Sequence, residues 1–185
     1  THFFNNYGMN KIRKQEFVFL LNEGLGYKTS IDEETNNMRI DVHKKVLQKD
    51  YEVSDSVVTV KTRGKYQKIF REQIVLPNYD YQCAVTEIKT TSLLRAAHIV
   101  RWSDNEKERL NPKNGICLSS LIDDCFERGY ITIDSDYKIN VSNKINNDPN
   151  LLKELLKYDG KKIHLPKDQE LRPAKSFLLE HSNRF

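Results

Sequence analysis

The chain has 185 residues, enough for one domain or for one domain with a substantial appendage. Lys and Arg number 30 and Asp and Glu number 26, so the formal net charge is only +4, which leaves a nucleic-acid partner open without arguing for it. We do not expect a membrane protein, because no apolar run approaches the roughly 18 residues that a spanning helix needs.

The cysteines argue for a reducing compartment. Cys83, Cys117 and Cys125 form no Cys-x-x-Cys pair, and an odd number favours free thiols over a disulfide framework. They are too few and too scattered to supply the four ligands of a structural zinc site, so we expect no structural zinc. The first residues have no basic patch before an apolar stretch and are not typical of a signal peptide. We therefore expect a cytoplasmic protein.

The N-terminal part, residues 1–62, is expected to be a small α/β region. Apolar residues near helical spacing predict a helix over 11–22, which Gly24 and Gly26 end. The polar stretch 28–37 predicts a loop, and the β-branched residues of 51–61 predict a strand.

Residues 61–71 contain five cations and no acidic residue, with Tyr66 and Phe70 interleaved. Two interpretations stay open. The cations could neutralise phosphates while the aromatics pack on sugar or base. Alternatively, the segment is a solvated helix face whose aromatic side chains go to the core.

From residue 74 on, short apolar stretches alternate with turn signals, the first of them Pro77-Asn78, and predict an α+β fold. The elements expected in chain order are strands over 83–86 and 93–100, a loop over 111–115, a helix over 116–128 that Gly129 ends, a hairpin of 131–133 with 138–141, and helices over 150–157 and 174–182.

One stretch carries residues suited to chemistry. His98 lies in an otherwise apolar strand, Asn114-Gly115 follows in a loop, and Asp123 and Glu127 are four residues apart on the next helix. Carboxylates at this spacing lie on one face and repel each other unless a cation separates them. Hard oxygen ligands select Mg²⁺, Ca²⁺ or Mn²⁺, and a neutral imidazole beside such a metal could deprotonate a water.

Each of these residues also has a plainer interpretation. A histidine in an apolar strand is more often a core or edge residue with its hydrogen bonds satisfied. Two acids one turn apart are more often a solvated helix face, and Asn-Gly is more often only a turn. The residues alone leave both sets of interpretations open.

Four motifs in this order give the chain a family resemblance. They are Tyr81–Thr86, Ala96–Val100 with Trp102, Asn111–Leu118 and Phe126–Ile133. Together they resemble the HNH endonuclease family, most closely its restriction-type branch. Arg63-Gly64, Phe70-Arg71, Leu178, His181 and Phe185 extend the resemblance over residues 63–185, which would form the nuclease domain. Residues 1–62 resemble nothing we can name and would form a separate region, for DNA recognition or dimerisation.

The resemblance implies a fold and a set of roles. The fold would be a ββα-metal core with flanking helices, in which a β-hairpin packs on a helix around one divalent cation. The catalytic residues would be His98, as general base, and Asn114, which ties down the loop and holds the base. Asp123 and Glu127 would bind Mg²⁺ or Mn²⁺. The partner would be double-stranded DNA, and a homodimer would match a palindromic site.

Contacts with the DNA backbone would come from basic side chains, which position the duplex without reading its sequence. The candidates are Lys61, Arg63, Lys65, Lys68, Arg71, Arg95, Arg101 and Arg128. The chain departs from the family pattern at Ala97 and Ile122, where many relatives have metal-binding side chains. Two alternatives therefore stay open: a DNA-binding module with a decayed site, and a non-catalytic interaction domain on the same scaffold.

Overall fold

A computed structural model describes residues 33–54, 60–145 and 147–185 of the chain. The chain divides into two compact units, residues 1–36 and 37–185, and the following concerns the second. The helix expected over 11–22 lies outside the described residues, as do residues 55–59 of the expected strand over 51–61. None of the helices described in these ranges is long and apolar enough to cross a membrane.

Two of the elements expected near the N-terminus differ from the structure. The loop expected over 28–37 is wrong from Glu33 on, because helix α2 spans Glu33–Leu47. The polar residues before Val42 do not oppose a helix, and Val42 itself is buried in the core. The expected strand over 51–61 is also wrong where it is described: residues 51–54 are irregular, and α3 begins at Val60.

A continuous helical segment leads from α3 towards the sheet. Helix α3 (Val60–Ile69) passes into the π-helix η3 (Phe70–Val75) and then into the short α4 (Leu76–Asn78), which ends at the expected Pro77-Asn78 turn signal. A π-helical turn is rare and changes the direction of the side chains that follow it. Here it buries Phe70, Ile74 and Val75.

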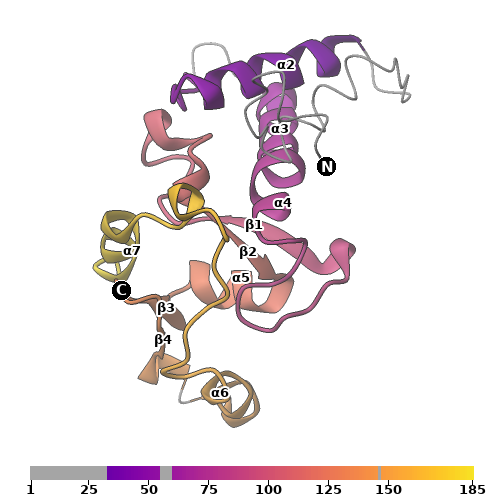
Figure 1. Cartoon of the computed structure of the whole chain (residues 1–185). Helices are drawn as coiled ribbons and strands as arrows, with labels where there is room; N and C mark the ends of the chain where they lie inside the picture. Colours follow the sequence, from indigo (N-terminus) through magenta and orange to yellow (C-terminus); the bar gives the residue numbers. More distant parts are fainter. Residues whose placement is uncertain (1–32, 55–59, 146) are drawn as a thin grey trace, which may run out of the picture. The chain divides into compact units, whose positions relative to one another are not determined.

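The centre of the fold is a two-stranded antiparallel sheet followed directly by a helix. Strand β1 (Leu94–His98) pairs with β2 (Gly115–Ser119), with His98 opposite Gly115. Helix α5 (Ser120–Glu127) follows β2 and packs against both strands (Figure 1). The strand expected over 93–100 is confirmed in its central residues.

The helix expected over 116–128 is wrong in its first four residues, which belong to β2. All five residues of β2 are buried, so the strand has apolar side chains on both faces and lacks the alternation that distinguishes a half-exposed strand. A short apolar run of this kind cannot be told from the start of a buried helix by its pattern alone.

The strand expected over 83–86 is a turn. The Glu87 amide donates to the Cys83 carbonyl at 3.1 Å, and the Cys83 sulfur accepts from the amides of Thr86, at 3.3 Å, and Ser119, at 3.1 Å. The chain therefore curls around a buried thiol and is tied to the end of β2. All three cysteines are buried and free.

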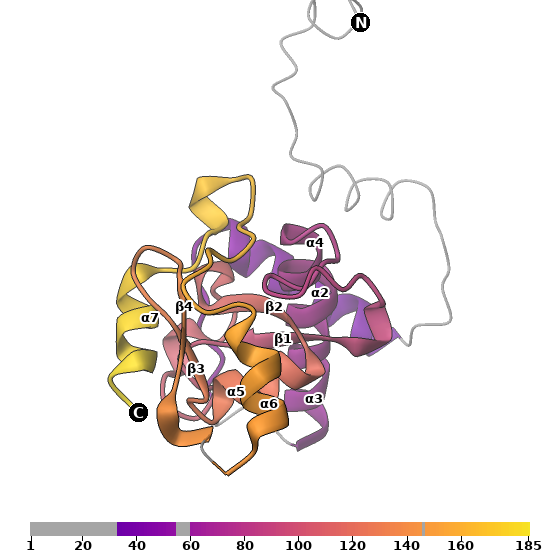
Figure 2. The ribbon, with the colours of Figure 1, turned by 90° about the horizontal axis from the view of Figure 1, so that it is seen from below.

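The C-terminal elements follow the predictions. Strands β3 (Ile131–Ile133) and β4 (Ile139–Val141) form the expected hairpin, and α6 (Pro149–Leu156) and α7 (Lys175–Ser182) are the expected helices. Helix α7 packs against β3 (Figure 2). Gly129 ends α5 at φ +70°, and the amides of Gly129 and Tyr130 donate to Phe126 and Cys125, which is a Schellman motif.

Gly115 makes room for the π-helix on the sheet. A Cβ atom at this position would lie 2.4 Å from Val75 Cγ2 and 2.9 Å from Phe70 Cζ. The glycine of the Asn-Gly pair therefore serves close packing, since its own backbone is extended.

We expect Gly115→Ala to lower the free energy of unfolding by about 1–3 kcal/mol, because η3 must shift away from β2. Gly64→Ala is the matched control: Gly64 lies within α3 with nothing within 4 Å of a Cβ, so alanine should raise stability by about 0.5–1 kcal/mol. Urea unfolding of both variants measures the change in the free energy of unfolding. Equal changes in the two variants would contradict the close contact between Gly115 and η3.

Candidate active site

His98 is held at the end of β1 between two aromatic rings. Its imidazole stacks on Phe70 of η3, with ring centroids 4.2 Å apart, and meets the Trp102 ring edge-on at 5.8 Å. Phe70 is fully buried, whereas His98 keeps part of its surface exposed. The imidazole is thus held between the two rings at the edge of the core.

A backbone hydrogen bond determines which ring nitrogen of His98 carries the proton. Nε2 lies 3.0 Å from the carbonyl oxygen of Arg109. Because a carbonyl only accepts, Nε2 must donate, which leaves the lone pair on Nδ1 in the neutral ring. Desolvation lowers the pKa of His98 from 6.5 to about 4, and the positive charges of Arg109 and Arg63 act in the same direction. The imidazole is therefore neutral at physiological pH.

Asn114 ties the loop between β1 and β2 together. Its side chain is almost fully buried: Oδ1 accepts from the Val100 amide at 2.7 Å, and Nδ2 donates to the carbonyls of Val100, at 3.1 Å, and Glu108, at 3.0 Å. The loop that returns to β2 carries Arg109, next to Glu108. Asn114 therefore does more than form a turn, because its amide group holds both sides of the loop beside His98.

The carboxylates of α5 have different surroundings. Asp123 is half-buried, and burial raises its pKa to about 6, helped by the negative charges of Asp124 and Glu127 and opposed by Arg95. Glu127 is exposed and forms an ion pair with Arg101, with 2.7 Å between Oε1 and Nε. The cation beside Glu127 in this structure is therefore a guanidinium group.

Carboxylate oxygens such as those of Asp123 and Glu127 are the type of ligand that a hard divalent cation prefers. Mg²⁺ usually takes one or two carboxylates and fills its other positions with waters and substrate phosphates. Among the described residues, no group of three or more His, Cys, Asp or Glu side chains is placed to hold a metal. Asp123 and Glu127 could therefore supply only part of a metal's ligands. Ile122, the residue before Asp123, is buried in the core.

The predicted DNA-contacting cations are placed in different ways. Arg63 is exposed, and its guanidinium carbon lies 5.8 Å from the centre of the Trp102 ring, close to His98. Arg71 instead donates to the carbonyls of Thr91 and Leu94 and braces the start of β1. Arg95 donates to the carbonyls of Ser92 and Leu94.

The remaining predicted cations lie on α3 and directly after α5. Lys68 and Arg128 are exposed, Lys65 is partly buried, and the side chain of Lys61 lies outside the described residues. Phe70 is fully buried and Tyr66 half-buried, so the aromatics of residues 61–71 go to the core. The interpretation in which Phe70 packs on a sugar or base is wrong, because the Phe70 ring is fully buried and stacks on the His98 imidazole.

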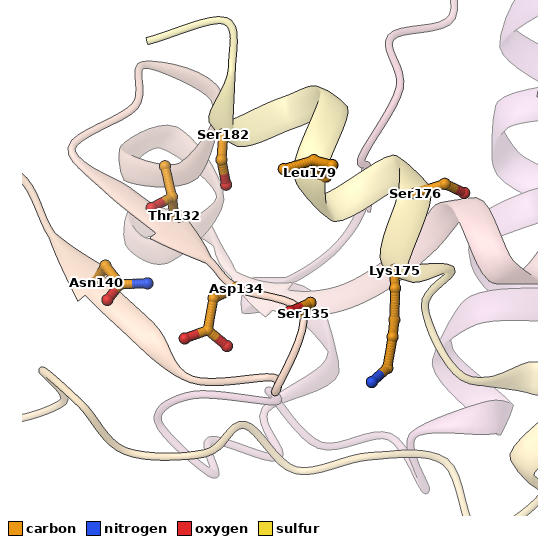
Figure 3. A pocket seen from close by; sticks show the side chains of 8 residues that line it. All are labelled: Thr132, Asp134, Ser135, Asn140, Lys175, Ser176, Leu179 and Ser182. Carbon is orange, nitrogen blue, oxygen red and sulfur yellow. The ribbon is translucent and has the colours of Figure 1, made fainter.

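The sequence interpretation missed Arg109, which is 1% exposed. It follows Glu106, Lys107 and Glu108, so it reads as part of a solvated charged loop, and no local pattern signals its burial. A separate hollow lies between the β3–β4 hairpin and α7 (Figure 3). None of the side chains that line it is a predicted site residue.

Residues 83–134 match a family model described as HNH endonuclease. This stretch contains β1, β2 and α5, with His98, Asn114, Asp123 and Glu127. The match supports the HNH family and suggests a nuclease, and the mixture of helices and small sheets is compatible with an α+β fold of this kind. No match was found among curated proteins.

The lowered pKa of His98 makes stability depend on pH. The folded pKa of about 4 lies below the ordinary value of 6.5, so the unfolded chain takes up the proton first as the pH falls. The neutral imidazole therefore contributes stability above pH 6.5 that is lost towards pH 4. We expect the wild type to lose stability relative to His98→Gln between pH 7 and pH 5 in urea unfolding. If the free energies of unfolding of the two proteins differ by the same amount over this pH range, the lowered pKa of His98 is contradicted.

Proposed function

We propose that the protein is a divalent-metal-dependent DNA endonuclease of the restriction type, with His98 as the general base. The observation that supports this best is the neutral imidazole of His98, whose Nδ1 lone pair is left free by the Nε2–Arg109 hydrogen bond. It lies at the end of β1, within the stretch that matches the HNH endonuclease family. On this proposal, β1, β2 and α5 form the ββα unit.

His98 would take a proton from the attacking water at Nδ1. The Arg109 carbonyl accepts from Nε2 and would stabilise the positive charge that the ring gains. A base with a pKa of about 4 is weak, but the phosphates of bound DNA would favour the charged ring and raise the pKa towards the working pH. Substrate binding would thus prepare the base for its task.

Asp123 and Glu127 would hold Mg²⁺ or Mn²⁺. Such an ion, when bound, supplies positive charge against the negative charge that grows on the phosphate. Glu127 would first have to exchange its Arg101 partner, and the released guanidinium would then be free to contact a DNA phosphate. Arg63, Lys65, Lys68, Arg95 and Arg128, with Lys61, would add further contacts to the backbone, whereas Arg71 is largely used by backbone carbonyls.

A DNA-binding module without cleavage is the second candidate. The Arg101–Glu127 ion pair favours it, because a guanidinium already neutralises one of the two proposed ligands. DNA recognition by residues 1–62 and a homodimer on a palindromic site remain part of the proposal for either candidate.

His98→Ala should abolish Mg²⁺-dependent cleavage of plasmid DNA while DNA binding stays largely intact. The reason is that the His98 side chain would take a proton from the attacking water and would not contact the DNA backbone. His164→Ala, which removes a half-buried histidine outside the site, should cut like the wild type. Cutting by His98→Ala at the wild-type rate would remove His98 as the base. Binding without cutting by the wild type, with a steep dependence on salt, would favour the second candidate.

Asp123→Ala should weaken Mn²⁺ binding at least about tenfold, whereas Asp124→Ala, on the exposed face of the same helix, should leave it nearly unchanged. Calorimetric titration of Mn²⁺ into each protein measures the affinity. Equal affinity of the wild type and Asp123→Ala would exclude Asp123 as a ligand.

A further inference from the structure

We propose that Arg109 is a positioning residue that holds His98 in its Nε2–H tautomer, and that residues 51–53 help to fix Arg109 in place. This inference rests on the proposed role of His98 as the base. It begins from the unusual place of the arginine: a cation that is 1% exposed is stable in the core only if its N–H groups are paired.

The guanidinium of Arg109 joins three segments of chain. Nε donates to the Trp102 carbonyl at 2.8 Å, and one terminal nitrogen donates to the Val53 carbonyl at 2.5 Å. The other terminal nitrogen lies 3.8 Å from a carboxylate oxygen of Glu106. Only a planar group with several fixed donors can serve these directions at once, which is a property of arginine and not of lysine.

Two neighbours of His98 depend on this anchor. The carbonyl that accepts from Nε2 belongs to Arg109 itself, so fixing the side chain limits how far that carbonyl can move. The Trp102 ring that meets His98 edge-on also lies under the guanidinium, 4.8 Å from its carbon to the ring centre. The tautomer and the orientation of His98 are therefore set by groups that Arg109 holds.

The segment before α3 completes the anchor. Besides the bond from Arg109 to the Val53 carbonyl, the Val53 amide donates to the Glu106 carbonyl and the Leu110 amide donates to the Tyr51 carbonyl, both at 3.1 Å. These bonds attach residues 51–53 to the loop on both sides of Arg109. The segment lies outside the stretch that matches the family model, so a part of the chain without family resemblance supports the candidate base.

The test must separate geometry from charge. Arg109 and Arg63 are the charged groups that act on His98, and the loss of either cation would by itself raise the pKa of the ring. Arg109→Lys keeps the charge and loses the planar set of donors. Arg63→Gln removes a charge and leaves the Arg109 carbonyl in place, so it is the matched control.

The measurement is the state of the His98 ring in ¹⁵N-histidine-labelled full-length protein, without metal or DNA, at neutral pH. We expect the wild type and Arg63→Gln to show a single Nε2–H tautomer with a slowly exchanging Nε2 proton. Arg109→Lys should show mixed tautomers and loss of the slowly exchanging signal. An unchanged ring signal in Arg109→Lys would overturn the proposal.

A second measurement connects the ring to the reaction. Cleavage by Arg109→Lys should fall about 100-fold with DNA affinity retained, as expected for a misplaced reacting group. Arg172→Lys, in which a different arginine also donates to a backbone carbonyl, should keep the wild-type rate. If the wild type does not cleave, the proposed function fails while the ring measurement still decides the role of Arg109.

Thermal unfolding shows whether Arg109→Lys folds. If it does not, Arg109→Met is judged by the same tautomer criterion, because it leaves no charge to bury. Failure of both variants to fold would overturn the proposal in favour of a purely structural role.

Discussion

The hydrogen bond from His98 Nε2 to the Arg109 carbonyl is the constraint around which the site is built. An imidazole enclosed between aromatic rings loses water, and its N–H group is costly unless another acceptor replaces that water. The carbonyl replaces it only if its loop stays in place, which Asn114 ensures through bonds to Val100 and Glu108. The absence of a side chain at Gly115 then lets η3 approach closely enough to stack on the imidazole.

The same need for compensation governs the charges of α5. Burial and the negative charges of Asp124 and Glu127 raise the pKa of Asp123, Arg95 opposes that rise, and Arg101 pairs with Glu127. On the proposed function, a divalent cation would neutralise these carboxylates more strongly and would compete with Arg101 for Glu127. The small net charge of +4 hides this arrangement, because some cations stabilise acids and carbonyls while others, such as Arg63, lie exposed beside the site.

Elements with a complete local signal were predicted well. The β3–β4 hairpin and α6 show clear periodicity with turn residues at their ends, and α7 follows the turn signal of Pro173. Gly129 ends α5 as expected because its left-handed backbone allows the Schellman hydrogen bonds. Elements whose partners are distant in sequence were predicted poorly. Strand β2 is buried on both faces. The turn at Cys83 depends on hydrogen bonds that backbone amides donate to the cysteine sulfur, one of them from the distant Ser119.

The sequence by itself singled out the candidate residues of the site: His98, Asn114 and the two carboxylates one turn apart stand out by type, spacing and order. Only the tertiary structure decided how they are held. Residue type does not say which ring nitrogen of His98 is protonated, because that depends on a carbonyl eleven positions away. Nor does it distinguish a buried arginine from a solvated one, since Arg109 finds its partner at Val53, 56 positions away, only in the folded chain.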